Sequence, residues 1–298
     1  MFSIIIPTYN SSSYISKALD SILCQSIDVE LIEVIIIDDN SSDFGRLAKV
    51  VRCFEEKITI RLISNNKKGN ASVSRNIGLN QAKNDIICLL DADDYWSPNK
   101  LEAGEKLLKE KCVVYTRLKR GTYKQLDNNE YSLIPKHLKS EKESLGEYWF
   151  ENKGVTQTSS LMYRKQDFPN ICFNEKLKRH QDYDFCLQLE NNDAKFVFDE
   201  FSLTYWVILD QDINAVTKGA DLDFCINWLE EYSIYLKEKS RNYYIGKNMF
   251  IIAIKDRSIT KWISYLSKLS FKRRCEIVKI TTKVIFEKVT SKVLSRCR

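Results

Sequence analysis

Three carboxylates stand within four positions in the stretch LLDADDYW, residues 89–96: Asp91, Asp93 and Asp94. They follow the apolar run 86–90, which is typical of a buried strand. Like charges this close repel one another, so crowding them brings no structural gain. Mg²⁺ and Mn²⁺ prefer oxygen ligands, and Mg²⁺ keeps several waters and completes its shell with substrate phosphates. The cluster therefore indicates a metal site that would bind a diphosphate.

A simpler interpretation of these residues stays open. Asp91 could cap the following turn while Asp93 and Asp94 are merely solvated. A D-x-D motif is short and common, so on its own it favours this second interpretation. Other residues at the same edge of the fold must decide between the two.

The first hundred residues alternate between strand and helix patterns. Strands are predicted at residues 3–6 (stopped by Pro7), 33–37, 59–63 and 86–90, and helices at residues 15–23, 44–54 and 73–82. This order predicts an α/β fold, a parallel sheet with helices on both faces. Such sheets bind ligands at the carboxyl ends of their strands. After residue 110 the pattern loosens, and residues 119–144 are expected to form an irregular loop.

Three predicted strand ends carry polar clusters, at residues 7–10, 38–42 and 91–94. A carboxylate such as Asp39 could accept a hydrogen bond from a base N–H or a ribose hydroxyl. No G-x-G-x-x-G follows the first strand, which excludes the usual NAD or FAD site. Residues 38–42 also fit a helix-capping turn, and this alternative stays open.

Composition excludes several classes of protein. With 298 residues, 44% hydrophobic and 29% charged, the chain is long enough for a large core and is not of the disordered type. Nine cysteines are scattered without a C-x-x-C pair, and no basic leader precedes an apolar run, so we expect a reducing, cytoplasmic location. The only histidines are His137 and His180, which argues against a zinc site or a Ser-His-Asp triad.

The order of segments resembles the family 2 glycosyltransferases, which have the GT-A fold. The matching segments are SIIIPTYNSSSYISKALDSILCQS, EVIIIDDNSSD, NNKKGNASVSRNIGLNQAKNDIICLLDADDYWSPNKL and HQDYDFCLQL. The resemblance implies a Rossmann-like, mostly parallel sheet flanked by helices. It also implies a nucleotide-sugar-binding half at residues 1–110, an acceptor-binding half at 111–215, and a helical, basic C-terminal extension at 216–298.

The same resemblance implies a nucleotide-sugar donor, commonly a UDP-sugar, and Mn²⁺ or Mg²⁺ as cofactor. The residues implied are Pro7, Thr8 and Tyr9 at the base, Asp39 at the uracil N3–H, Arg75 and Asn76 beside the nucleotide, Asp91 at the ribose or the water shell of the metal, Asp93 in direct metal contact and Asp94 as a secondary ligand. Arg75 could instead be an ordinary surface residue of a helix.

Transfer to an acceptor hydroxyl also requires a base on the side away from the diphosphate. In the family this base is the Asp of a Glu-Asp pair that opens a helix, and here the pair is Gln181-Asp182. The resemblance therefore implies Asp182 as the general base, with inversion at the sugar C1. The alternative is that Asp182 only favours the helix N-terminus.

Two further regions bear on the substrates. Related enzymes often close over the diphosphate with an Arg and a His, but YWVILDQDINAVTKG has no His, and Lys218 is a weak substitute. The segment VTQTSSLMYR resembles the acceptor-side strand of the family. Gln157, Thr158 and Ser159 could contact acceptor hydroxyls, although ordinary strand polarity explains them equally well.

The basicity of the chain is concentrated in its last 27 residues. Residues 272–298 hold nine Lys/Arg and two Glu, a local +7, which leaves −1 for the rest of a chain whose net charge is +6. Apolar residues recur there at helical intervals, so the tail could lie on an anionic membrane surface as a peripheral contact. Alternatively it could pack on the catalytic domain as a final helix with a solvated basic face. No motif that reads DNA or RNA accompanies the charge, so we expect no nucleic-acid partner.

Together these features predict a metal-assisted, inverting glycosyltransferase. It would move a hexosyl or N-acetylhexosaminyl group from a nucleotide sugar to a cell-surface polysaccharide or glycolipid, with a saccharide or lipid-linked saccharide as acceptor. We expect it in the cytoplasm, where it could contact the inner face of the cell membrane. One rival is a sugar-phosphate nucleotidyltransferase, which would need a Gly-rich phosphate loop where PTYNSSS stands. The other is a non-catalytic relative that binds nucleotide sugars.

Overall fold

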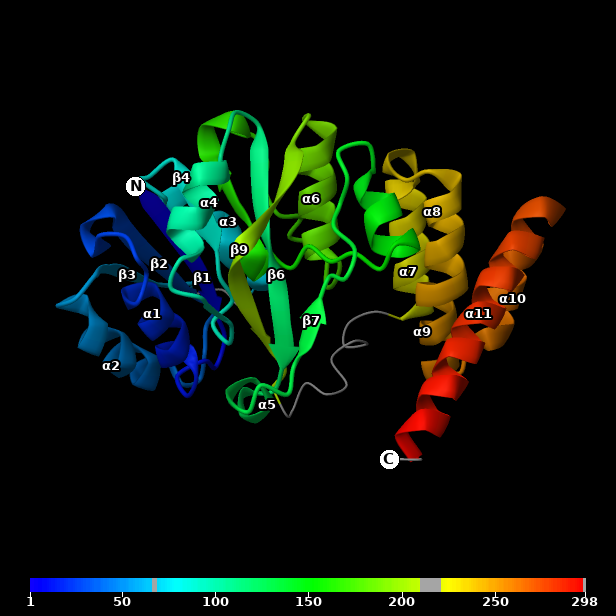
Figure 1. Cartoon of the computed structure of the whole chain (residues 1–298), viewed down its shortest axis with the longest axis horizontal. Helices are drawn as coiled ribbons and strands as arrows, with labels where there is room; N and C mark the ends of the chain where they lie inside the picture. The colour runs from blue at the N-terminus through cyan, green and yellow to red at the C-terminus, as the bar shows by residue number, and fades with distance from the viewer. Residues whose placement is uncertain (66–68, 210–220, 297–298) are drawn as a thin grey trace. The chain divides into compact units, whose positions relative to one another are not determined.

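The computed structural model describes residues 1–65, 69–209 and 221–296, and the chain divides into two compact units. The larger unit comprises Met1–Lys142 and Gly154–Ile213, and the smaller one comprises Glu143–Lys153 and Asn214–Arg298 (Figure 1).

A nine-stranded sheet runs through the larger unit in the order β3-β2-β1-β4-β8-β6-β9-β5, with β7 paired to β6. Its parallel half consists of β1 (Phe2–Thr8), β2 (Ile32–Asp38), β3 (Thr59–Ser64) and β4 (Ile86–Leu89). Its mixed half consists of β5 (Tyr95–Trp96), β6 (Cys112–Gly121), β7 (Ser132–Ile134), β8 (Met162–Arg164) and β9 (Lys195–Val207). The predicted Rossmann-like α/β fold is therefore confirmed, but the sheet as a whole is mixed and only its first half is entirely parallel.

Pro7 does not stop the first strand, so that detail of the prediction is wrong. β1 runs on to Thr8, with Pro7 opposite Ile37 of β2. On its other side β1 pairs with β4 only as far as Ile5. The missing N–H of Pro7 therefore breaks no ladder hydrogen bond to β4, which is why proline is tolerated at this position.

The helices of the larger unit follow the strands as crossover connections and covers. They are α1 (Ile15–Leu23), α2 (Phe44–Glu55), α3 (Ala71–Gln81), α4 (Lys100–Leu107), α5 (Tyr123–Asp127) and α6 (Gln181–Asn191), with short 3₁₀ turns at Val29–Leu31, Thr158–Ser160 and Lys165–Asp167. The stretch 119–144 is not the irregular loop that the sequence suggested, because it contains the end of β6, α5 and β7.

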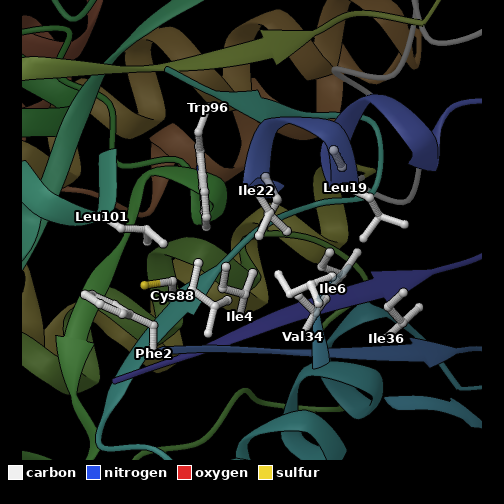
Figure 2. Packing of buried hydrophobic residues seen from close by; sticks show 14 of the residues in the cluster. Phe2, Ile4, Ile6, Leu19, Ile22, Val34, Ile36, Cys88, Trp96 and Leu101 are labelled. Carbon is white, nitrogen blue, oxygen red and sulfur yellow. The ribbon is translucent and has the colours of Figure 1, made fainter. Parts of the chain in front are cut away.

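Both faces of the parallel half-sheet are covered, which explains its continuous apolar strands. On one face Ile4 and Ile6 of β1 pack toward Leu19 and Ile22 of α1 (Figure 2). On the other face α3 lies so close that a Cβ on Gly78 would come within 2.4 Å of the Ile5 side chain and 2.8 Å of Ile37. The sheet is thus held between two helical layers, and its carboxyl edge is left to carry the polar clusters.

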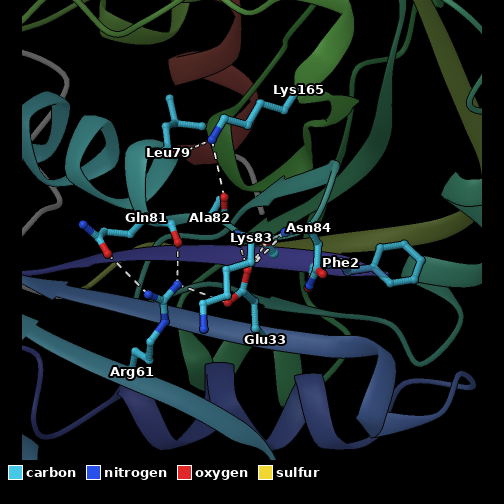
Figure 3. A network of polar contacts seen from close by, with 10 residues as sticks. Phe2, Glu33, Arg61, Leu79, Gln81, Ala82, Lys83, Asn84 and Lys165 are labelled. Atoms are coloured by element: carbon cyan, nitrogen blue, oxygen red, sulfur yellow. Dashed lines mark hydrogen bonds and ion pairs between the residues drawn. The ribbon is translucent and has the colours of Figure 1, made fainter.

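The opposite, amino-terminal side of the half-sheet is fastened by a buried carboxylate (Figure 3). Glu33 accepts hydrogen bonds from Ser3 Oγ at 2.5 Å and from the Lys83 N–H at 2.7 Å, and Arg61 Nη2 lies 3.1 Å from its second oxygen. Although burial raises the pKa of Glu33, these donors and the Arg61 charge bring it below its ordinary value. This network joins β1, β2 and β3 at the end of the sheet away from the polar clusters.

The smaller unit is helical, as the resemblance implied for the C-terminal extension. It contains a π-helical turn at Glu147–Glu151, α7 (Leu222–Glu231), a 3₁₀ turn at Tyr232–Tyr235, α8 (Glu238–Tyr243), a π-helical turn at Tyr244–Met249, α9 (Phe250–Lys255), α10 (Ile259–Ser267) and α11 (Phe271–Arg296). The rings of Phe150, Trp228 and Tyr244 form its core. No helix in the described ranges is both long and apolar enough to cross a bilayer.

Candidate active site

The first polar cluster lies where β1 and β2 end side by side. Thr8 pairs with Asp38 in the parallel register, and Thr8 Oγ1 donates to the Ile37 carbonyl at 3.2 Å. Asp38 is fully buried and accepts from the N–H and the hydroxyl of Ser41, so it shapes the turn after β2. Tyr9, by contrast, is 46% exposed beyond the end of β1.

Asp39 lies at the same edge with its carboxylate directed toward the segment that leads into α3. Its Oδ1 accepts from the Gly69 N–H at 2.7 Å and from Asn65 Nδ2 at 3.3 Å. Its own N–H donates to the Thr8 carbonyl at 2.9 Å, which fixes it beside β1. The structure therefore brings Asp39, Thr8 and Tyr9 to one corner of the sheet, as the sequence predicted.

Arg75 connects the end of β4 with the start of α6. The Asn70 side chain caps α3 by accepting from the Ser72 and Val73 N–H groups, and Arg75 lies one turn further on. Its Nη2 lies 2.5 Å from Asp91 Oδ1, and its Nη1 donates to Gln181 Oε1 at 3.2 Å. With only 5% of its surface exposed, Arg75 is not an ordinary surface residue of a helix.

Asn76, the neighbour of Arg75, fastens a different segment. Its Nδ2 donates to the Phe173 carbonyl and to Glu175 Oε1, both at 2.9 Å, and its Oδ1 accepts from the Phe173 N–H at 2.8 Å. The Phe173 ring in turn lies 5.2 Å from the Arg75 guanidinium. Asn76 therefore holds residues 173–175, which precede α6, in place near Arg75.

Asp182 stands in the first turn of α6, next to the residue that Arg75 holds. It is partly exposed, and burial raises its pKa above the ordinary value, while the Tyr183 N–H and the charges of Arg75 and Arg179 act in the opposite direction. His180, in the left-handed conformation with φ of 63°, ends the approach to the helix. Burial and the charge of Arg179 lower the pKa of His180 to about 3, so this side chain is neutral at physiological pH.

Asp91, Asp93 and Asp94 have different environments. Asp94 is 1% exposed, and it accepts from Ser159 Oγ at 2.6 Å, Gln157 Nε2 at 2.7 Å and the Val207 N–H at 2.9 Å. Burial and the neighbouring Asp93 and Asp91 raise its pKa well above the ordinary value. Because protein donors already occupy both oxygens, the structure favours a bracing role for Asp94 over a position in a metal shell.

Asp93 is partly exposed, and Tyr123 Oη donates to its backbone carbonyl at 2.9 Å. In the described part of the chain no three His, Cys, Asp or Glu side chains converge on one point. Mg²⁺, however, is commonly held by one or two carboxylates together with substrate phosphates, rather than by a cage made only of protein groups. Asp93, with Asp91 beside it, therefore fits an ion that arrives with a diphosphate.

The segment 156–160 has a role that the sequence did not reveal. The expected acceptor residues Gln157 and Ser159 contact Asp94, and Ser159 Oγ also accepts from the Asp91 N–H at 2.9 Å. The backbone of this segment is held by Trp96 Nε1, 2.7 Å from the Ser159 carbonyl, and by buried Lys100, whose Nζ lies 2.9 Å from the Ser160 carbonyl. A polar run in an otherwise apolar region was the only signal, and it fitted a surface strand equally well. Lys218, the weak candidate for a phosphate contact, lies outside the described residues.

Comparison with known proteins identifies the family. The chain matches the model for glycosyl transferase family 2 over residues 3–171, and it belongs to that family. The amylovoran biosynthesis glycosyltransferase AmsB of Erwinia amylovora is 30% identical over 246 residues, which is 80% of this chain and 79% of that protein. The poly(ribitol-phosphate) beta-N-acetylglucosaminyltransferase TarP of Staphylococcus aureus is 35% identical over 100 residues, 34% of this chain and 30% of that protein.

Solved structures agree on the fold. S. aureus TarS 1–349 in complex with UDP-GlcNAc superposes with a TM-score of 0.65 at 18% identity, covering 95% of this chain and 80% of that one. A longer S. aureus TarS structure gives a TM-score of 0.63 at 20% identity, and there this chain spans about half of the other, 53%. The α/β fold with helical extension is therefore that of a family 2 glycosyltransferase, and the protein is an enzyme of that class.

Proposed function

We propose that this enzyme transfers a hexosyl or N-acetylhexosaminyl group from a UDP-sugar to a hydroxyl of a growing cell-surface polysaccharide or glycolipid, with inversion at C1. One observation carries the proposal. Arg75 holds Asp91 with one guanidinium nitrogen and Gln181, the neighbour of Asp182, with another, so that donor-side and acceptor-side acids share one edge of the sheet. The names of AmsB, TarP and the TarS complex with UDP-GlcNAc support the substrate classes.

The donor nucleotide is proposed to bind at the corner formed by β1 and β2. Pro7, Thr8 and Tyr9 would line the base, and the Asp39 carboxylate would accept the uracil N3–H. Asp39 already accepts from the Gly69 N–H at 2.7 Å, so it presents an oriented acceptor rather than a mobile one. Asp91 would reach the ribose or the water shell of the metal. Arg75 and Asn76 would act indirectly: Arg75 orients Asp91, and Asn76 holds Phe173.

Mn²⁺ or Mg²⁺ is proposed as cofactor, held by Asp93 together with the donor diphosphate. The bound ion would act as a Lewis acid that stabilises the charge of the departing UDP. Asp94 supports this arrangement from below, since its three protein donors fix the turn that carries Asp93. The partial exposure of Asp93 favours it over buried Asp94 as the direct ligand.

Asp182 is proposed as the general base. It would accept the proton of the acceptor hydroxyl as the oxygen attacks C1 and the bond from C1 to the diphosphate breaks. Its raised pKa makes it a better proton acceptor than an ordinary solvated aspartate, and the charges of Arg75 and Arg179 oppose that rise. Gln181, which stands where the family has Glu, contributes an oxygen that accepts from Arg75 and thereby orients the helix start.

The acceptor is proposed to be presented at the inner face of the cell membrane, which α11 would contact. α11 packs within the smaller unit through buried Ile277, Ile280 and Thr281. A second apolar face stays exposed, with Phe271 at 75%, Val278 at 51%, Ile285 at 46% and Phe286 at 69%. Exposed Lys272, Lys279 and Lys283 lie beside this face, and their charges would attract anionic lipid.

The deciding experiment combines nucleotide binding with transfer. UDP should raise the melting temperature more with Mn²⁺ or Mg²⁺ than with a chelator, and a screen of nucleotide sugars should find one that releases UDP. Asp182→Asn should keep the metal-dependent UDP shift and lose transfer. Equal UDP shifts with metal and with chelator would refute the metal, and an active Asp182→Asn would refute the base. UDP binding by the wild type without turnover of any donor would favour the non-catalytic alternative.

A further inference from the structure

Four tyrosines and two lysines from separate elements of the larger unit form one continuous column. Its order is Tyr123, Lys17, Tyr95, Tyr205, Lys119, Tyr131. Lys17 Nζ lies 4.8 Å from the ring centroid of Tyr123 and 4.7 Å from that of Tyr95, and the Tyr95 and Tyr205 rings stack at 4.3 Å with an interplanar angle of 9°. Lys119 Nζ lies 5.3 Å from Tyr205 and 4.4 Å from Tyr131. We call this set the tyrosine–lysine column.

The column lies beside the proposed catalytic edge. Tyr95 follows Asp93 by two residues, and Tyr123 Oη donates to the Asp93 carbonyl at 2.9 Å. Strand pairing places Tyr95 opposite Tyr205, and Tyr205 opposite Lys119. The side chains of the column are all partly exposed, so it forms a wall facing solvent rather than a part of the core.

The ammonium groups of the column are not neutralised by buried acids. Lys119 makes no ion pair with any carboxylate in the described residues, and its neighbours are two ring faces. Ring faces attract a cation, but they do not satisfy its three N–H donors as a carboxylate or phosphate would. Lys17 pairs with Asp127 at 3.1 Å, yet the Asp127 side chain is 64% exposed, and such surface pairs contribute little.

The phenols add further donors to the same wall. Tyr95, Tyr205 and Tyr131 each carry a phenol hydroxyl that can donate a hydrogen bond to a ligand. Apart from Tyr123 Oη, which donates to the Asp93 carbonyl, these ammonium and hydroxyl groups form a strip of donors that suits a ligand rich in oxygen and carrying negative charge. A neutral saccharide would leave the Lys119 charge uncompensated.

We propose that the tyrosine–lysine column binds an oxyanion carried by the acceptor, so that the acceptor is an anionic glycan whose repeating unit bears a phosphate or a carboxylate. This inference rests on the proposed transfer function, and it adds the chemical class of the acceptor. Lys119 and Lys17 contact the charged group, while the tyrosines hold the two ammonium groups in a fixed row leading to Asp93.

The test compares three oligosaccharides of similar length with the full chain: an oligogalacturonate, an oligo(glycerol phosphate) and a neutral malto-oligosaccharide. Binding is measured by calorimetry at low and high salt. At least one anionic oligomer should bind about tenfold more tightly than the neutral one, the gain expected from one charge-assisted hydrogen bond, and the gain should shrink at high salt. Whichever anionic oligomer binds identifies the source of the charge as carboxylate or phosphate.

Substitutions of single lysines test whether the column is the site that binds the anionic oligosaccharide. Lys119→Ala should weaken anionic binding about tenfold, and Lys119→Arg should restore most of it. Lys106→Ala is the matched control, because Lys106 is an exposed lysine of α4 that pairs with Glu102 away from the column. Equal affinity for neutral and anionic oligomers, or equal effects of Lys119→Ala and Lys106→Ala, would overturn the proposal. The metal-dependent rise in melting temperature with UDP is recorded for the wild type and for each variant. If the wild type showed no such rise, the result would count against the transfer function and not against the column alone.

Discussion

Arg75 Nη2 lies 2.5 Å from Asp91 Oδ1, and this ion pair joins α3 to the end of β4. The same guanidinium reaches Gln181 at the start of α6, so one side chain sets the spacing of three elements. Because the Arg75 side chain is only 7% exposed, its charge depends on Asp91 for compensation.

Arg75→Ala should therefore impair both stability and transfer. Loss of hydrogen bonds to a charged group should lower the free energy of unfolding by about 2 kcal/mol. Displacement of Asp91 or Asp182 by about 1 Å should reduce transfer about 100-fold. Denaturant unfolding and donor turnover measure the two effects.

Arg61→Ala is the matched control, since Arg61 bridges Glu33 and the Gln81 carbonyl on the amino-terminal side of the sheet. It should lower stability without weakening UDP binding. If Arg61→Ala reduced transfer as much as Arg75→Ala, the effect of Arg75 would be one of stability alone.

Asp93 and Asp94 should separate metal binding from folding. Asp94→Ala leaves three protein donors facing a cavity, from Ser159, Gln157 and the Val207 backbone, and should cost about 3 kcal/mol or more. Asp93→Ala should change stability by less than about 1 kcal/mol and abolish the additional UDP shift that Mn²⁺ gives. Thermal melts with and without nucleotide and metal measure both. A stable Asp94→Ala, or an Asp93→Ala that keeps the metal effect, would reverse the assigned roles.

The pH profile of transfer should report Asp182. Burial raises its folded-state pKa above the ordinary aspartate value, so the active, ionised base should be lost as pH falls through a midpoint higher than for a solvated aspartate. Arg179 lowers this pKa, so Arg179→Ala should shift the acidic limb of kcat/KM further toward neutral pH. A shift toward lower pH in Arg179→Ala would contradict the assignment.

The raised pKa of Asp182 also affects how the stability of the fold depends on pH. The folded state then binds the proton more tightly than the unfolded state, so the contribution of this group is greatest below the unfolded pKa and declines as pH rises through the folded one. Asp182→Asn should remove that decline, and the pH dependence of the melting temperature should be flatter on the acidic side than in the wild type.

The parallel half of the fold was predictable because its signals are local. Strands β1, β2 and β4 are largely apolar runs, and the helices between them show one-sided periodicity. Each element can therefore be recognised from about ten consecutive residues. The polar residues at their ends then meet because parallel strands end at one edge. Thr8, Asp39 and Asp91 lie at the carboxyl ends of β1, β2 and β4, as this pattern predicts.

The different environments of Asp93 and Asp94 could not be predicted from the sequence. Asp94 is distinguished from Asp93 by the Val207 N–H, 113 positions away, and by Gln157 and Ser159. These contacts depend on how β9 and the segment 156–160 fold back, which no local pattern encodes. In the stretch 119–144 one local signal was overlooked, the reciprocal capping of α5 by Thr122 and Gln125.

Gly78 should control the packing of α3 on the sheet. Gly78→Ala would place a methyl group 2.4 Å from Ile5 and 2.8 Å from Ile37, so we expect a loss of about 1–3 kcal/mol from overpacking. Gly45→Ala is the matched control in α2, where nothing lies within 4 Å, and it should gain up to about 1 kcal/mol from helix propensity. Urea unfolding compares the two. Opposite signs are expected, and a neutral Gly78→Ala would mean that α3 is free to move away from the sheet.

The exposed face of α11 should determine membrane binding. Phe286 and Val278 are exposed apolar residues on that face, and burying a side chain of this size in the lipid interface contributes about 1.5–3 kcal/mol. Phe286→Asp should therefore lower partitioning onto vesicles that contain anionic phosphatidylglycerol by at least about tenfold. Lys279→Ala and Lys283→Ala should each lower it about fivefold, in line with about 1 kcal/mol per lysine near an anionic surface.

Cosedimentation with anionic and with purely zwitterionic vesicles measures this effect. Phe201→Asp is the matched control, because Phe201 is 75% exposed, compared with 69% for Phe286, but lies on β9 of the larger unit. It should bind vesicles as the wild type does, and zwitterionic vesicles should bind neither protein strongly because the lysines find no charge there. Equal binding of Phe286→Asp and the wild type would refute the membrane contact. If Phe286→Asp instead converted a dimer into a monomer in light scattering, the exposed face would be an interface between two copies of the chain.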